Sequence, residues 1–318
     1  MQWLYDTDVQ EPERMTMTQP EYRIDGGGYT AVIRGLGATV RDLSFEGRPL
    51  VVGFGAGEEM PNFRGAFVAP WPNRIADGRY FFDGVHYQLP VNEPERCTAL
   101  HGLVYDIPWD RLTHNASSVT LACAVEPREG YPFELSLQAR FSVGEEGLRT
   151  EVTAVNTGAT RAPYGVCPHP YLVAGTSPLD DWVLELPAST VLTVTPDRLL
   201  PVARKTVGGT SFDFRSSRAL GDVRIDHAFT DLARADDGSV TVRVIDPANG
   251  TGTAMTWDAS CPWVQIHTAD LPQTPGSTRL GLAVEPMTCP PEAFNTGEDL
   301  VVLEPGEAHR TGWTIGSL

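Results

Sequence analysis

The chain has 318 residues, of which 41% are hydrophobic and only 20% are charged, so it can build a large apolar core. Its net charge of −17 repels nucleic acid and anionic membranes, and we expect neither as a partner. No apolar run is long enough to span a bilayer and no signal peptide is recognisable, so a cytoplasmic protein is expected. The 5 cysteines lack paired spacing and are predicted to be buried free thiols.

The first stretch, residues 1–20, is polar and aperiodic, and it is predicted to be a tail or an added edge strand. After it, apolar and polar residues alternate as they do in half-buried antiparallel strands. The clearest examples are Tyr29–Arg34, Val119–Val125, Phe133–Ser142, Leu148–Val155, Val240–Ile245 and Arg310–Ile315. The chain is therefore predicted to belong to the all-β class.

Turn signals separate these strands. Asp83 and Gly84 stand between two aromatic-rich runs and predict a two-residue hairpin, and Asp246–Gly250 predicts another turn. Pro290–Phe294 predicts a single helical turn, whereas no window predicts a long amphipathic helix. Since no stretch has the composition of a linker, residues 21–318 are predicted to form one large antiparallel β-sandwich domain with few short helices.

Arg74 lies in a segment that two prolines stiffen, directly after Asn73. A fixed guanidinium offers a planar set of donors to hydroxyl groups or to an oxyanion. The alternative is a surface arginine paired with Asp77 or Asp83. His101 is the next candidate, although a histidine beside a glycine in an apolar stretch is also typical of a hydrogen-bonded core residue.

His169 and Glu285 are the candidates for proton transfer. His169 lies between two prolines, which fix the backbone and remove competing N–H donors around the imidazole. Glu285 ends an apolar strand and precedes Pro286. A carboxyl group placed there is partly desolvated, which raises its pKa towards the range of a general base. A glutamate turned to solvent at the strand end is the alternative.

Asp226 and Gln265 suit the hydroxyl groups of a sugar. Gln265 shares one strand face with Trp263 and His267, which would offer an aromatic surface beside polar groups. Core packing of Trp263 is an equal alternative, and Asp226 could instead cap a strand. The histidines do not fall at metal-ligand spacings, and no nucleotide or metalloprotease motif is present, so no metal is expected.

Taken together, the ordered segments resemble the aldose 1-epimerase, or galactose mutarotase, family across nearly the whole chain after the tail. Each segment is short, and the specificity comes from their order. The segments are Gly37–Thr39, Leu50–Phe54, Asn73–Ile75, Leu100–Gly102, His169–Tyr171, Asp226–Phe229, Gln265, Glu285–Pro286 and Leu303–Glu307.

The resemblance implies a large β-sandwich and an acid/base reaction on a small-molecule sugar without a cofactor. It implies that His169 is the acid, protonating the ring oxygen, and that Glu285 is the base, taking the proton of the anomeric hydroxyl. It implies that the substrate is held by Asn73, Arg74, His101, Asp226 and Gln265.

Departures from the family pattern leave the sugar open. Leu172 and Val173 replace an aromatic residue and an asparagine after the histidine motif, and His267 replaces an aromatic residue. These changes resemble a bacterial subgroup whose members are not all galactose enzymes. One hypothesis is an epimerase for an anionic hexose, phosphorylated or sulfonated, because arginines are frequent in the segment expected to line the pocket. They are Arg64, Arg74, Arg79 and Arg96.

Other functions stay open at this point. A non-catalytic sugar-binding or regulatory protein on the same scaffold has no need for both His169 and Glu285. A glycoside hydrolase or lyase would release product from a glycoside, and its two carboxylates could also come from distant segments. A monomer and a homodimer are both compatible with the sequence, because an all-β chain has edge strands.

Overall fold

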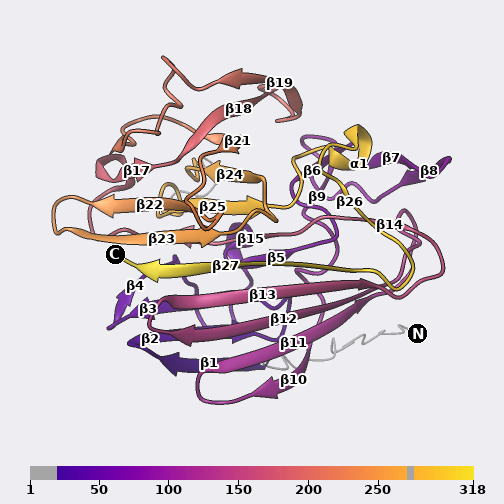
Figure 1. Ribbon diagram of the computed structural model, residues 1–318, viewed down its shortest axis with the longest axis horizontal. Coiled ribbons are helices and arrows are strands. Elements are labelled where there is room, and N and C mark those ends of the chain that lie inside the picture. Colours follow the sequence, from indigo (N-terminus) through magenta and orange to yellow (C-terminus); the bar gives the residue numbers. More distant parts are fainter. Residues whose placement is uncertain (1–19, 271–275) are drawn as a thin grey trace, which may run out of the picture.

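The structure is a computed structural model that describes residues 20–270 and 276–318. The predicted tail or edge strand at residues 1–20 lies, except for Pro20, outside the described residues. The largest sheet is antiparallel and runs across the molecule (Figure 1). Its strands, in spatial order, are β10 (Asp110–His114), β11 (Ser118–Val125), β12 (Leu135–Gly144), β13 (Gly147–Asn156), β27 (Ala308–Ser317), β23 (Thr251–Trp257), β22 (Val240–Asp246), β17 (Val183–Glu185) and β20 (Arg218–Ala219).

Two further antiparallel sheets complete the sandwich. A four-stranded sheet comes from the N-terminal part of the described chain, and a six-stranded sheet comes mostly from its second half. The four-stranded sheet contains β1 (Glu21–Gly26), β2 (Tyr29–Arg34), β3 (Val40–Phe45) and β4 (Arg48–Pro49). The six-stranded sheet runs in the order β16 (Tyr171–Leu172), β25 (Leu282–Met287), β24 (Trp263–His267), β21 (Asp226–Leu232), β18 (Ala188–Val194) and β19 (Pro201–Thr206).

Short two-stranded ribbons join these sheets. The ribbons are β5 (Ala66–Val68) with β15 (Cys167–His169), β6 (Arg74–Ala76) with β9 (Thr98–Leu100), β7 (Arg79–Phe82) with β8 (Val85–Gln88), and β14 (Ala162–Tyr164) with β26 (Val301–Leu303). Helical structure in the described residues is limited to α1 (Ala293–Thr296) and the 3₁₀ turns η1 (Pro61–Phe63) and η2 (Leu179–Asp181). Within them, no helix is long and apolar enough to cross a membrane.

The predicted all-β class and antiparallel sandwich are confirmed. Each strand predicted from alternation coincides with an observed strand, and Asp83 and Gly84 do form the hairpin turn between β7 and β8. The helical turn begins at Ala293, later than predicted, because Glu292 directly before it has a left-handed conformation, with φ 66° and ψ 12°. The prediction of buried thiols is wrong for Cys97, which is exposed in the turn before β9, and Cys123 is only half-buried.

The core connects the large sheet to the ribbons. Residues of β12 alternate between buried and exposed, so one face of this strand packs inward. Phe67 in β5 lies between Trp109 and Trp313, with ring centroids 5.1 Å and 6.4 Å away. Since Trp313 belongs to β27 in the middle of the nine-stranded sheet, this aromatic contact fixes the β5–β15 ribbon against that sheet.

Gly102 follows β9 with φ +72°, and a Cβ added there would lie 2.1 Å from the carbonyl oxygen of Ala69. We expect Gly102→Ala to lower the free energy of unfolding by roughly 3 kcal/mol or more, since both strain and a backbone clash result. Gly84 is the matched control, because its φ is +81° but nothing lies within 4 Å of the added Cβ. Gly84→Ala should cost only about 1 kcal/mol. Urea unfolding of both variants measures the difference, and equal losses would contradict it.

Candidate active site

The β6–β9 ribbon brings Asn73, Arg74 and His101 together from two separate sequence segments. Arg74 pairs with Leu100 across the ribbon, and His101 follows directly, its backbone N–H donating to the carbonyl oxygen of Asn73 at 2.9 Å. Asn73 and His101 have left-handed φ values of 56° and 62°, a conformation that turns the chain sharply at both positions. All of these side chains are buried.

The β5–β15 ribbon carries His169 to Glu285. His169 pairs with Ala66, and its carbonyl oxygen accepts a hydrogen bond from Gly65. The imidazole Nε2 of His169 lies 3.5 Å from Oε1 of Glu285 in β25, and the two residues are 5% and 2% exposed. The His169 ring also meets the His101 ring edge to face, with centroids 5.1 Å apart. The two ribbons and β25 therefore converge on one buried cluster.

The six-stranded sheet supplies the remaining candidates. Gln265 in β24 pairs with Glu285 in β25, and His267 pairs with Asp226 in β21. Strand alternation places these side chains on one face of the sheet. The amide Nε2 of Gln265 donates to Oδ1 of Asp226 at 2.6 Å, and the charge of Arg74 acts on both Asp226 and Glu285. All the residues predicted for the site thus lie in one neighbourhood.

The surface alternative for Arg74 is wrong. Its guanidinium is buried and donates to both carboxylate oxygens of Glu93, from Nε at 2.8 Å and from Nη2 at 2.9 Å. Asp77 and Asp83 instead bind Arg198 and Arg161. Sequence analysis missed Glu93, because it sits in a polar run that has the composition of an ordinary exposed loop.

Aromatic side chains complete the surroundings of the histidines. Phe63 lies with its ring centroid 4.7 Å from that of His101 and 6.1 Å from that of His169. The ring centroid of Tyr171 lies 5.3 Å from that of His169. Trp263 is fully buried and its indole N–H donates to Asp299, so for this residue core packing is confirmed and an exposed stacking surface is wrong.

Burial shifts the pKa values of the catalytic candidates in opposite directions. Desolvation raises the pKa of Glu285 well above its usual 4.5, and the negative charge of Asp226 adds to this effect. Desolvation and the nearby His267 lower the pKa of His169 from 6.5 to about 3. Each shift favours the uncharged form of its group. Both shifts therefore favour the carboxyl group of Glu285 over the imidazole of His169 as the carrier of a proton.

Several polar atoms of the cluster are buried without a hydrogen-bond partner among the described residues. They include Nδ1 of His101, Nδ1 of His169 and Oε1 of Gln265. Buried polar groups in proteins are nearly always paired, so such a concentration is typical of a site that pairs with a ligand. In the described part of the chain, no group of three or more His, Cys, Asp or Glu residues is placed to hold a metal ion.

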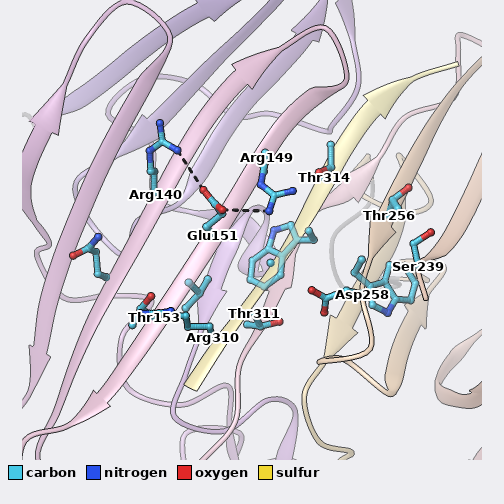
Figure 2. Close-up of a pocket in the computed structure, with 15 residues that line it drawn as sticks. Arg140, Arg149, Glu151, Thr153, Ser239, Thr256, Asp258, Arg310, Thr311 and Thr314 are labelled. Carbon is cyan, nitrogen blue, oxygen red and sulfur yellow. Dashed lines mark hydrogen bonds and ion pairs between the residues drawn. The ribbon is translucent and has the colours of Figure 1, made fainter. Parts of the chain in front are cut away.

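A separate hollow of about 580 Å³ lies on the outer face of the nine-stranded sheet (Figure 2). Its walls come from β12, β13, β27 and β23, and none of the predicted site residues lines it. Arg140 and Arg149 both pair with Glu151 there, so this carboxylate is held between two cations. It offers no adjacent acid and base, and the proton-transfer candidates all lie in the buried cluster instead.

Comparison with known proteins accords with this geometry. A sequence model of the aldose 1-epimerase family matches residues 20–315. The chain belongs to the aldose 1-epimerase family. Relatives carrying the names aldose 1-epimerase and galactose mutarotase are isomerases, and the chain is accordingly an isomerase of this type.

Individual relatives of this family member cover most of its length. The uncharacterized protein YihR of Escherichia coli K12 is 37% identical, over 91% of this chain and 90% of that protein. The galactose mutarotase of Sus scrofa is 27% identical, over 96% of this chain and 94% of that protein. The aldose epimerase homologue of C. elegans has the same fold, with a TM-score of 0.82 at 22% identity over 94% of this chain and 99% of that one.

The raised pKa of Glu285 predicts how the free energy of unfolding changes with pH. Above pH 4.5 the unfolded chain releases this proton while the folded state retains it, so stability falls as pH rises towards the folded-state pKa. Glu285→Gln abolishes this loss. The variant should gain stability over the wild type by up to about 1.4 kcal/mol for each pH unit in that range. Urea unfolding at about pH 5 and about pH 7 tests this, and a pH-independent difference would contradict it.

Proposed function

We propose that the protein interconverts the α and β anomers of a hexose by acid/base ring opening and closure, without a cofactor. The observation that carries this proposal is the buried contact between His169 and Glu285, 3.5 Å apart, inside a cluster of sugar-compatible polar groups. An acid and a base that share one apolar site are the groups that ring opening needs. Family membership supports the same reaction class.

In ring opening, the carboxylate of Glu285 takes the proton of the anomeric hydroxyl while the imidazolium of His169 protonates the ring oxygen. The bond between C1 and the ring oxygen breaks with its electron pair going to oxygen, and C1 becomes an aldehyde. Rotation about C1–C2 then presents either face of the aldehyde. Closure reverses both proton transfers and gives either anomer.

The pKa shifts of the ligand-free pair favour the arrangement that follows ring opening, in which Glu285 rather than His169 carries the proton. A cyclic sugar requires the opposite arrangement, in which the same proton sits on His169. The two arrangements differ only in the position of that proton between side chains 3.5 Å apart. Each half-reaction moves two protons, one to Glu285 or from it and one from His169 or to it. The pair carries one proton before and after each step, so no net proton is taken from solvent.

The remaining residues are proposed to hold the sugar. Arg74 offers donors, Asp226 offers an acceptor, and the unpaired atoms of His101 and Gln265 can each take up a hydroxyl hydrogen bond. Asn73 lies beside the edge of Arg74 that Glu93 does not bind, and its Oδ1 accepts a long hydrogen bond from Nη1 of Arg74 at 3.4 Å. These groups would fix the anomeric carbon against the catalytic pair.

Exchange between anomers, followed by optical rotation of freshly dissolved single anomers, tests the proposal. Glu285→Gln and His169→Asn should each reduce kcat by roughly 10²–10⁴-fold, the usual contribution of a general acid or base. Glu151→Gln, on the outer sheet face, is the control and should leave the rate unchanged.

Two outcomes would point to the other functions. Sugar binding without any acceleration by the wild type would favour a binding protein. Release of free sugar from a glycoside would favour a hydrolase or lyase.

The anionic-sugar hypothesis now depends on Arg64. Of the arginines in the pocket segment, Arg74 and Arg96 bind Glu93, and Arg79 bonds to Gln88. Arg64 is only 7% exposed, yet its side chain has no hydrogen bond or ion pair to the described residues. Its charge acts on Tyr171, whose ring contacts His169.

If an anionic hexose is the substrate, Arg64→Gln should lower kcat/KM for a hexose 6-phosphate or 6-sulfonate by about tenfold or more, the fold-change for losing one charged hydrogen bond. The rate with neutral glucose or galactose should change little. Arg79→Gln is the matched control outside the cluster. An unchanged ratio between anionic and neutral sugars would remove the hypothesis.

A further inference from the structure

Glu93 is the most heavily bonded carboxylate beside the site. It accepts two hydrogen bonds from Arg74, one from Nη1 of Arg96 at 2.9 Å and one from the hydroxyl of Thr98 at 2.5 Å. Backbone hydrogen bonds between Glu93 and Thr98 close the same turn. The residue is 7% exposed, and the guanidinium of Arg74 helps to keep the pKa of Glu93 low despite burial. Glu93 is therefore a fixed, ionised group.

This arrangement determines which edge of Arg74 is free. Nε and Nη2 both donate to Glu93, while Nη1 lies next to Asn73 and has no other acceptor among the described residues. An arginine held along one edge keeps its guanidinium plane and direction, whereas an unpaired side chain of this length samples many rotamers. The edge left for a substrate hydroxyl is thus the Nη1 edge.

Arg74 also lies within electrostatic reach of Asp226 and Glu285. Other titratable groups that act on Glu285 are His169, Cys167 and Tyr171. Because Glu93 neutralises Arg74, the pair adds little net charge to the cluster. Without Glu93, the guanidinium would be an uncompensated buried cation beside these carboxyl groups, and a buried cation is stable only when it is paired.

We propose that Glu93 is a positioning residue, which holds Arg74 with its Nη1 edge towards the sugar and prevents it from forming an ion pair with Glu285. The effect of Glu93 on catalysis rests on the proposed function, whereas its effect on the orientation of Arg74 does not. A direct Arg74–Glu285 ion pair would occupy the base and stabilise its carboxylate, which lowers its affinity for a proton. Glu93 thereby preserves the basicity that burial gives to Glu285.

Glu93→Gln tests the proposal through two readouts. The carboxyl group of Glu285, followed by ¹³C NMR titration against Glu285→Gln, should release its proton at lower pH in the variant than in the wild type. The alkaline limb of the pH profile of kcat/KM should move in the same direction, and kcat/KM should fall about tenfold at its optimum. A purely structural loss would lower activity without moving either titration.

The matched control is Glu95→Gln, since Glu95 is 67% exposed and contacts only Arg96. It should change neither readout. Thr98→Val, which removes a single hydrogen bond to Glu93, should shift the Glu285 titration in the same direction by less. It also keeps the proposal testable if Glu93→Gln does not fold.

A double-variant cycle with Arg74→Gln separates the mechanism from an independent effect. If Glu93 acts through Arg74, adding Glu93→Gln to Arg74→Gln should change kcat/KM by less than about twofold. A further large loss in the double variant, or an unshifted Glu285 titration in Glu93→Gln, would overturn the proposal. A wild type without anomerase activity would instead overturn the proposed function, and the titration would still decide the role of Glu93.

Discussion

Glu285 places an ionisable carboxyl group in the middle of the otherwise apolar strand β25, and its burial governs the chemistry around it. Desolvation opposes the carboxylate and, at His169, the imidazolium, so burial raises the pKa of one group and lowers that of the other. In a solvent-exposed pair the carboxyl group would be ionised at neutral pH and would be a weak base. The charged neighbours Asp226 and Arg74 then shift the pKa of Glu285 in opposite directions.

The fold supports this burial by bringing short paired strands, and not loops alone, against His169 and Glu285. The β5–β15 ribbon is fixed by the aromatic packing of Phe67 on Trp313, and the β6–β9 ribbon by its pairing and by the backbone contact of His101 with Asn73. Buried charges are costly, and two of them have local partners: Arg74 is paired with Glu93, and Asp226 lies against Gln265 and His267. Strand pairing therefore fixes the backbone of these residues, and the ion pairs and hydrogen bonds fix their side chains.

The sequence predicted the strands well because alternation is a local property that packing then reinforces. It also singled out His169 and Glu285, which the structure brings into contact, since prolines around a histidine and a glutamate on an apolar strand are visible in a few consecutive residues. It could not predict that Arg74 binds Glu93, because nothing in the exposed-looking run Asn92–Arg96 signals a buried carboxylate. The burial of Trp263 was likewise undecided, since alternation gives the face of a strand but not what covers that face.

The position of β27 has a consequence for how the chain reaches this state. It is the last strand in the described chain, yet it lies in the middle of the nine-stranded sheet, between β13 and β23. Until residues 308–317 leave the ribosome, β13 and β23 have no partner on that side, and Trp313 is not there to support Phe67. The separations in sequence are long, which makes such closure slow. The nascent chain therefore carries an open edge at β13 until β27 follows, and Phe67 lacks its contact with Trp313 for the same interval.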